Sequence, residues 1–246
     1  MQFVSKLAKI YGHSLVGHQH DGTLKNLLAT KWVDKTTPKG SRPFFQISQS
    51  ESIIDMTLLG IDTESGGITT DYDLLTLTMC VIKDYEIVKT LDMKLKPNPV
   101  DGRSDYFVQA EALAVNGINI AEHDWRAMPY RQSKQIIFDW LEGAKNEFGK
   151  LLPFGNGVSR DIQLITKYTV SPPAWEMVVM RNPIELTSIG NNLKMLGLIP
   201  MNQSLALSKI ATYFGVEIDE EKVHTAEYDV WLGTQVLKHY NQLITK

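Results

Sequence analysis

The sequence predicts an α/β protein in which a mixed central sheet is flanked by helices. Short apolar or alternating runs that are typical of strands occur at 56–62, 74–82, 86–95 and 151–156, and segments of helical periodicity lie between and after them. A sheet with helices packed on it buries both kinds of element. Of the 246 residues, 43% are hydrophobic and 22% are charged, which is enough to build a real core.

The first half of this predicted domain is mostly strand. MTLLGID (56–62) is a short apolar run that ends at acidic residues, as expected for a buried strand. LLTLTMCVI (74–82) and EIVKTLDMKL (86–95) both alternate, and KDY between them fits the turn of a hairpin. Pro and Gly make 96–105 a loop, and QAEALAVNG (109–117) predicts a short helix that ends at Asn-Gly.

A long helix opens the second half. The segment 129–149 has Pro129 at its start, apolar residues at helical spacing and Gly149 at its end. LLPFGN (151–156) predicts a second short buried strand. DIQLITKYT (161–169) then predicts a helix that opens at its first residue.

The last third alternates between irregular and helical sequence. SPPAWEMVVMRNP (171–183) predicts irregular structure, with a strand at 177–180. SLALSKIATYFGV (204–216) predicts a helix, and the segment from about Thr225 predicts the final one.

Residues 1–55 form a predicted N-terminal extension to a domain of residues 56–246. Residues 1–50 carry a net charge of +5, whereas the other 196 residues sum to −8. A basic arm on an acidic body is suited to contacts with phosphates, but such arms are equally often only solvated. The net charge of −3 over the whole chain does not by itself indicate a nucleic-acid-binding protein.

Cysteine usage and hydropathy predict a cellular compartment. Cys80 is the single cysteine, so the chain forms no internal disulfide, and we expect a reducing, cytoplasmic location, which is the host cytoplasm if the protein is viral. The N-terminus lacks the apolar core of a signal peptide, and no apolar run approaches the roughly 20 residues that span a bilayer. We therefore expect no membrane partner.

Two carboxylates stand out at the end of the first predicted strand. Asp62 and Glu64 in GIDTE are two residues apart, so on a strand their side chains share a face. Two carboxylates at the end of a buried strand are unfavourable unless a positive charge lies between them. Mg²⁺ would relieve that repulsion, because it is a hard cation that prefers oxygen ligands. Two solvated acids at a surface strand end are the alternative, and the commoner one for this pair alone.

Two further places carry acidic or basic groups. Asp161 follows a Gly-flanked turn, where it would ordinarily cap a helix and complement its dipole. His224 and Asp229 differ by about 140° on a helix, so they converge only if His224 lies on the loop before the helix. A loop histidine can accept a proton from water near neutral pH, and a helical aspartate can bind a metal. A surface histidine and a helix-start aspartate are the alternative.

Together the three motifs, GIDTES, GNGVSRD and HTAEYD, resemble the DEDDh (DnaQ-like) exonuclease superfamily, which is named for four acids and a histidine. HTAEYD fits the H-x-A-x-x-D form of the third motif and is the most specific. QAEALAVNGI is similar to a segment of ribonuclease T, and QSLALSKIATYFGVEIDEEKV is similar to the segment that leads into the third motif. The resemblance covers about residues 57–243 and leaves 1–55 outside it.

The second motif departs from the common form H-N-x-x-F-D. Asn156 stands at the usual position of the histidine, and Arg160 replaces the aromatic residue. The sequence GNG followed by an acid is also similar to a branch of phage and bacterial exonucleases whose motif is W-G-N-G-x-x-F-D. We expect Arg160 either to face the substrate or to pair with an acid.

The resemblance implies a ribonuclease H-like fold and a two-metal-ion 3′→5′ exonuclease. Such an enzyme hydrolyses terminal phosphodiester bonds of single-stranded RNA or DNA to nucleoside 5′-monophosphates. Two Mg²⁺ or Mn²⁺ ions would be bound by the four acids, Asp62, Glu64, Asp161 and Asp229. His224 would accept the proton of the attacking water. The residues expected near the terminal nucleotide are Thr63, Ser65, Gly66, Asn156 and Arg160.

The expected partners are 3′ ends of single-stranded DNA or RNA and, by the same resemblance, a second copy of the chain in a homodimer. The alternative function is a non-catalytic adaptor that keeps an exonuclease fold to bind nucleic acid or a polymerase. A decayed site would be expected to lose at least one of its five residues, and all five are present in type here. This favours the enzyme and leaves RNA and DNA open as substrates.

Overall fold

The computed structural model describes residues 56–219, 222 and 225–245. The expected N-terminal extension and His224 lie outside these residues, so the domain boundary at residue 55 stays a prediction. None of the helices in the described ranges has the length and apolar character needed to cross a membrane.

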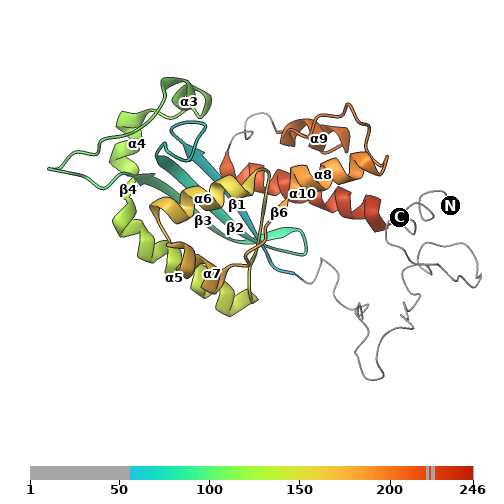
Figure 1. Ribbon diagram of the computed structural model, residues 1–246, viewed down its shortest axis with the longest axis horizontal. Coiled ribbons are helices and arrows are strands. Elements are labelled where there is room, and N and C mark those ends of the chain that lie inside the picture. The colour runs from blue at the N-terminus through green and yellow to red at the C-terminus, as the bar shows by residue number, and fades with distance from the viewer. Residues whose placement is uncertain (1–55, 220–221, 223–224, 246) are drawn as a thin grey trace, which may run out of the picture. The chain divides into compact units, whose positions relative to one another are not determined.

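A six-stranded mixed sheet forms the centre of the described region, in the spatial order β4-β3-β2-β1-β5-β6 (Figure 1). The strands are β1 (Leu58–Ser65), β2 (Leu74–Lys83), β3 (Glu86–Lys96), β4 (Met128–Pro129), β5 (Leu152–Gly155) and β6 (Ile184–Glu185). The first three strands form an antiparallel meander, whereas β5 runs parallel to β1 and β6 parallel to β5. The carboxyl ends of β1 and β5 therefore lie at the same edge of the sheet.

The turn between β2 and β3 confirms the predicted hairpin. Lys83 pairs with Glu86, which leaves a loop of two residues. Asp84 and Tyr85 have φ angles of 53° and 65°, both in the left-handed region. Two-residue hairpin turns require this backbone geometry because it matches the twist of the strands.

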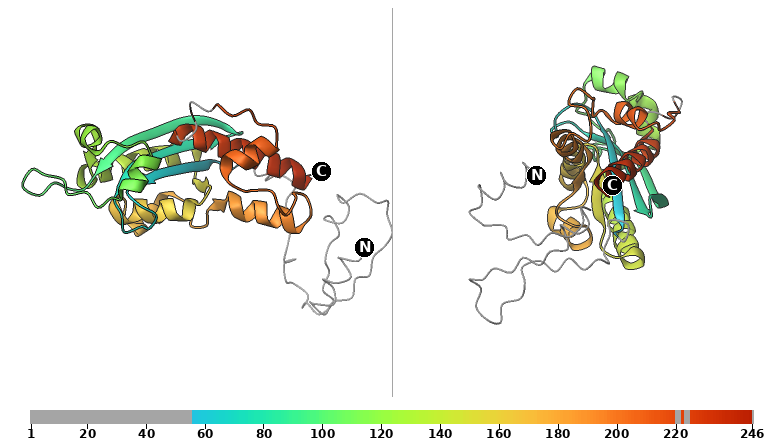
Figure 2. Two further views of the ribbon diagram at one scale, coloured as in Figure 1. Left: turned by 90° about the horizontal axis from the view of Figure 1, so that it is seen from above. Right: turned by 90° about the vertical axis from the view of Figure 1, so that its right-hand side faces the viewer.

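Helices cover both faces of the sheet (Figure 1). One face packs on α5 (Tyr130–Phe148), α6 (Val158–Tyr168) and α7 (Pro172–Val178), and the other packs on α8 (Leu186–Met195), α9 (Leu207–Tyr213) and α10 (Ala226–Thr245). Two short helices, α3 (Ala110–Val115) and α4 (Ile120–Arg126), follow β3. α10 crosses β1, β2 and β3 (Figure 2). The predicted α/β fold with a mixed, helix-flanked sheet is confirmed.

Alternation along β1 separates two hydrophobic cores. Leu59 and Ile61 belong to the core on the α5–α7 side. Leu58 belongs to the core beneath α8–α10. Because successive strand residues point to opposite faces, one short strand contributes to both cores and has almost no exposed apolar side chain.

Several boundaries differ from the predictions. The strand predicted at 177–180 is wrong, because α7 extends to Val178 and only Val179 forms a bridge, with Leu151. Two prolines at the start of α7 suit the first turn of a helix, where no amide hydrogen is needed. α6 begins three residues before Asp161, so this aspartate lies in the first turn but does not open the helix.

Other elements were not foreseen. β1 continues to Ser65, so Glu64 belongs to the strand itself. The predicted helix at 204–216 is shortened to α9. α8 had no prediction, and its sequence, with Gly190 and two asparagines, has low intrinsic helix propensity. Tertiary packing decides here, because a Cβ at Gly190 would lie only 2.6 Å from the Tyr240 hydroxyl oxygen of α10.

Candidate active site

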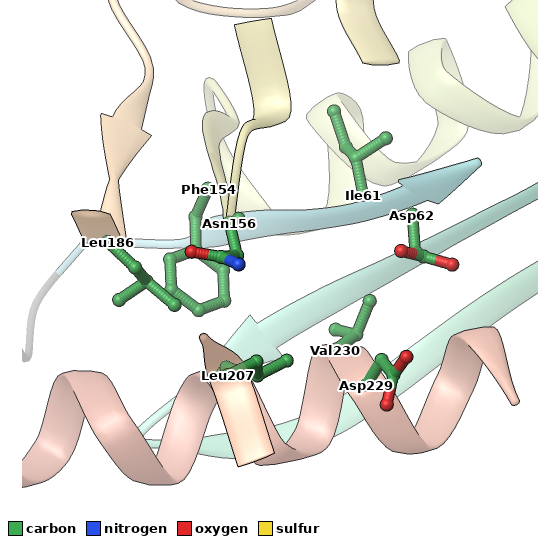
Figure 3. Close-up of a pocket in the computed structure, with 10 residues that line it drawn as sticks. Ile61, Asp62, Phe154, Asn156, Leu186, Leu207, Asp229 and Val230 are labelled. Carbon is green, nitrogen blue, oxygen red and sulfur yellow. The ribbon is translucent and has the colours of Figure 1, made fainter. Parts of the chain in front are cut away.

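β1 directs Asp62 and Glu64 toward α10. Gly60, two residues earlier, lies so close to α10 that an added Cβ would be 2.3 Å from Val230 Cγ1. Alternate strand residues share a face, so Asp62 and Glu64 project to the same side as Gly60. Figure 3 shows Asp62 on β1 and Asp229 on α10 turned toward the same space. Two of the motifs therefore meet across one gap between strand and helix.

Asp161 approaches from the parallel neighbour of β1. It lies in the first turn of α6, just after β5, and only 8% of its surface is exposed. The Thr63 hydroxyl donates a 2.5 Å hydrogen bond to Asp161 Oδ1. Thr63 points to the opposite face of β1 from Asp62, so β1 contributes a carboxylate on one side and a hydroxyl partner for Asp161 on the other.

Glu185 anchors the turn that leads to Asp161. Its two carboxylate oxygens accept hydrogen bonds from the backbone amides of Gly157, at 3.0 Å, and Ser159, at 2.8 Å. The amides at the start of a helix have no partner within the helix, and a carboxylate there also complements the helix dipole. Glu185 thus fixes the GNG turn and the start of α6, a role for which the sequence around it contains no signal.

Burial and mutual repulsion dominate the electrostatics. Burial raises the pKa of Asp62 well above its ordinary value, and the charges of Asp161, Glu64 and Asp229 raise it further. Burial also raises the pKa of Asp161 to about 6, although the hydrogen bond from Thr63 and the charge of Arg160 partly oppose this. Carboxylates from three separate segments therefore act on one another around Asp62.

The carboxylates fit a divalent cation chemically. Within the described residues, Asp62 Oδ2 is buried and has no hydrogen-bond partner, which is costly for a carboxylate oxygen. All four candidate ligands supply oxygen, the donor that Mg²⁺ and Mn²⁺ prefer. No three His, Cys, Asp or Glu side chains of the described region converge into a ready-made metal cluster. The Asp161 carboxylate is directed toward Thr63, so cation binding would require the candidate carboxylates to move toward one another.

A pocket of about 140 Å³ adjoins Asp62 and Asp229 (Figure 3). Its wall comes from β1, β5 and the helices on the α10 side, and it is about equally polar and apolar. The lining residues are Ile61, Asp62, Phe154, Gly155, Asn156, Leu186, Leu207, Asp229, Val230 and Gly233. Asn156, which is exposed, adds an amide beside the two carboxylates.

The turn after β1 is held from within the chain. Arg160 Nη2 donates hydrogen bonds of 2.6 Å to Ser65 Oγ and to the Gly67 carbonyl oxygen. Ser65 Oγ itself donates to the same carbonyl, at 2.7 Å. Gly66 is buried, and its amide and carbonyl bond to Asp73 and Gln109. Of the residues expected to contact a nucleotide, Ser65, Gly66 and Arg160 thus engage one another or the surrounding backbone.

The structure therefore brings Asp62, Glu64, Asp161 and Asp229 into electrostatic contact and gives no position for His224. Sequence reasoning missed the hydroxyl of Thr63 as the partner of Asp161, and it missed Glu185. Both contacts join residues that are far apart in the chain, so neither leaves a local pattern to find.

At the level of sequence, no family model and no curated protein matches the chain. Solved structures do match it in fold. A structure of exonuclease I superposes with a TM-score of 0.60 at 18% identity over 77% of this chain and 43% of that one. E. coli exonuclease I in complex with a dT13 oligonucleotide gives 0.60 and 18% over 75% and 40%. Cell-death related nuclease 4 gives 0.55 and 16% over 76% and 64%.

The chain spans less than half the length of the exonuclease I chains that it matches. At sequence identities below 20%, these matches establish a shared fold only. The protein thus has the ribonuclease H-like exonuclease fold that its motifs predicted.

Proposed function

We propose that this protein is a divalent-cation-dependent 3′→5′ exonuclease. It hydrolyses the terminal phosphodiester bond of single-stranded DNA or RNA and releases nucleoside 5′-monophosphates. One observation carries the proposal: on an exonuclease fold, carboxylates from β1, α6 and α10 perturb one another around the buried, unpaired oxygen of Asp62.

The four acids of the motifs, Asp62, Glu64, Asp161 and Asp229, would hold two Mg²⁺ or Mn²⁺ ions. When bound, such ions lower the pKa of a water nucleophile and stabilise the charge on the leaving 3′ oxygen. E. coli exonuclease I is known in metal-free and zinc-bound forms with single-stranded DNA, which supports a metal-responsive site in a protein of this fold.

The chain's own residues prepare the site for this chemistry. Burial disfavours the charged forms of Asp62 and Asp161 when no cation is present. A bound divalent cation would offset this cost, which favours cation binding at this site. Glu185 and Thr63 hold Asp161 through the start of α6 and through its Oδ1. His224, which precedes α10 in the sequence, accepts the proton of the attacking water.

Single strands are the proposed substrate class. The pocket combines apolar side chains with the carboxylates of Asp62 and Asp229 and the amide of Asn156, so it offers an unpaired nucleoside both apolar and polar contacts. The oligonucleotides bound to E. coli exonuclease I, dT13 and dA16, are single strands as well.

Self-association remains a prediction of the sequence resemblance, to be checked by light scattering.

A time course on 5′-labelled single-stranded DNA and RNA of one sequence tests the proposal. The reaction is run in Mg²⁺ and in EDTA, with wild type, His224→Ala and the control His239→Ala. His239 lies in the second half of α10, and its ring stacks on Phe214 with a centroid distance of 5.1 Å. We expect a Mg²⁺-dependent ladder that shortens from the 3′ end, is lost in His224→Ala and persists in His239→Ala.

Two results would contradict the proposal. Internal cuts without a ladder would indicate an endonuclease. No cleavage of either strand in Mg²⁺ or Mn²⁺, by a folded wild-type protein that still binds the strands, would favour the adaptor.

A further inference from the structure

We propose that Arg160 is a positioning residue that ties α6, which carries Asp161, to the turn Ser65–Gly67 at the end of β1, which carries Asp62 and Glu64. The inference deepens the proposed nuclease function and rests on it for its catalytic consequence. The structural part of the inference is that one guanidinium joins two segments that carry candidate metal ligands, and it depends only on the observed contacts.

The guanidinium of Arg160 is committed to this turn. A single nitrogen, Nη2, donates at 2.6 Å to both Ser65 Oγ and the Gly67 carbonyl oxygen. Within the described residues, Arg160 Nε is buried and has no hydrogen-bond partner. The side chain therefore holds this conformation although one of its own donors is unsatisfied. Both hydrogen bonds are part-buried and charge-assisted, and charge-assisted bonds are roughly twice as strong as neutral ones.

The turn is fixed on its other sides by the rest of the fold. The Gly66 amide donates to the Asp73 carbonyl at 2.8 Å, and the Gly66 carbonyl accepts from the Gln109 amide at 2.6 Å. Asn116 Nδ2 donates to the Ser65 carbonyl at 3.2 Å. Arg160 supplies the contacts from the first turn of α6, whereas Lys167 and Tyr168 at the end of the same helix bond to carbonyl oxygens of residues 70–72.

The turn packs closely against Val108 and Tyr72 at its two glycines. A Cβ added at Gly66 would lie 2.4 Å from Val108 Cγ1, and one added at Gly67 would lie 2.3 Å from the Tyr72 ring. There is no space at Gly66 or Gly67 for a longer side chain that could replace the contacts of Arg160. When Arg160 is removed, we therefore expect the distance between the turn and the start of α6 to increase slightly.

Phenylalanine, the aromatic residue of the common motif H-N-x-x-F-D, has no donor for these two oxygens, whereas Arg160 donates to both. The Gly67 carbonyl also accepts from Ser65 Oγ, and the planar guanidinium of Arg160 adds a second donor from a fixed direction while donating to Ser65 Oγ as well. A lysine can reach with one ammonium group but lacks the planar geometry. The residues Ser65 and Arg160, 95 positions apart, thus form one unit.

The catalytic consequence follows from the positions of the ligands. Asp62 and Glu64 lie directly before the turn, and Asp161 directly follows Arg160. A displacement of about 1 Å between groups that must act together can reduce a rate by about 100-fold. The loss should appear in kcat, because the contacts of Arg160 are to the protein itself.

The test compares Arg160→Met, Arg160→Lys and Ser65→Ala with wild type and with the control Arg181→Met. Arg181 is an exposed arginine that pairs with Glu176 at 3.0 Å. Two quantities are measured: kcat and KM for a single-stranded oligonucleotide, and amide hydrogen exchange in residues 64–73. For Arg160→Met we expect kcat to fall by about 100-fold with KM changed less than about threefold. Exchange at 64–73 should accelerate while α5 is unaffected, Arg160→Lys should recover part of both, and Arg181→Met should match wild type.

Each outcome decides between defined alternatives. If Arg160→Met raises KM and leaves kcat and exchange unchanged, Arg160 contacts the substrate and the positioning role is wrong. If neither quantity changes, the role is also wrong. If wild type hydrolyses nothing, the proposed function fails, and exchange at 64–73 alone decides the role of Arg160. Should Arg160→Met not fold, Ser65→Ala and Arg160→Lys provide the same comparison, and unchanged exchange in both would overturn the inference.

Discussion

Replacing Asp161 with Asn should stabilise the metal-free protein at neutral pH. Burial raises the pKa of this carboxyl from 3.8 to about 6. As the pH rises, the unfolded chain loses the proton near pH 4 whereas the folded chain keeps it to about pH 6. Wild-type stability therefore declines across this interval and remains lower above it. At about 1.36 kcal/mol per pKa unit, the full effect is about 3 kcal/mol.

The asparagine variant does not titrate in this range and keeps the shape of the side chain. About 2 kcal/mol of the difference should develop between pH 4.5 and 7.5, which corresponds to about 4–8 °C in Tm for a protein of this size. Loss of the Asp161 charge also removes a repulsion on Asp62, which acts in the same direction. The assay is thermal or urea unfolding in EDTA at both pH values.

Asp139→Asn, at an exposed carboxylate on α5, serves as the control for the substitution itself. At 1,000 times its Kd for Mg²⁺, wild type should gain about 4.1 kcal/mol, which exceeds the full effect of about 3 kcal/mol and reverses the order. A pH-independent difference between Asp161→Asn and wild type would refute the electrostatic reasoning.

Three further predictions concern the frame of the site. Gly60→Ala should destabilise the fold by about 1–3 kcal/mol in urea titrations, because its Cβ would overlap Val230 of α10; wild-type stability would show that the helix can move away freely. Glu185→Ala should cost about 1 kcal/mol by the same measurement and slow hydrolysis, because the start of α6 loses two acceptors; an unchanged rate would remove Glu185 from the positioning of Asp161. The Cys80 thiol, whose pKa burial raises to about 11, should react with a thiol reagent only on unfolding, and rapid reaction in native buffer would contradict its burial.

Local patterns predicted most of the fold because they arise from neighbouring residues. The alternation of apolar and polar residues predicted the β2–β3 hairpin. The helical spacing of apolar residues after Pro129 predicted the bounds of α5 to within a residue or two. The i, i+2 spacing of Asp62 and Glu64 predicted a shared face without reference to any other part of the chain. The strand predicted at 177–180 failed because apolar runs of four residues fit a helix end as well as a strand.

The candidate site was predicted differently. Nothing in the residues alone required β1, α6 and α10 to bring their acids together, and that expectation came from the resemblance of the three motifs to a known superfamily. The contacts that support the site, Thr63 with Asp161 and Arg160 with Ser65, join residues 98 and 95 positions apart. Such contacts depend on the finished packing and leave no periodicity in the sequence.

The most direct test of the proposed mechanism is the initial rate at which nucleoside 5′-monophosphates leave the 3′ end of single-stranded DNA in Mg²⁺. Wild type is compared with Asp62→Asn and with Asp139→Asn. Asp62 is the residue on which the other three carboxylates act. We predict that Asp62→Asn lowers the rate by about 1000-fold or more and that Asp139→Asn leaves it unchanged. Release by Asp62→Asn at the wild-type rate would contradict the assignment of catalysis to this site.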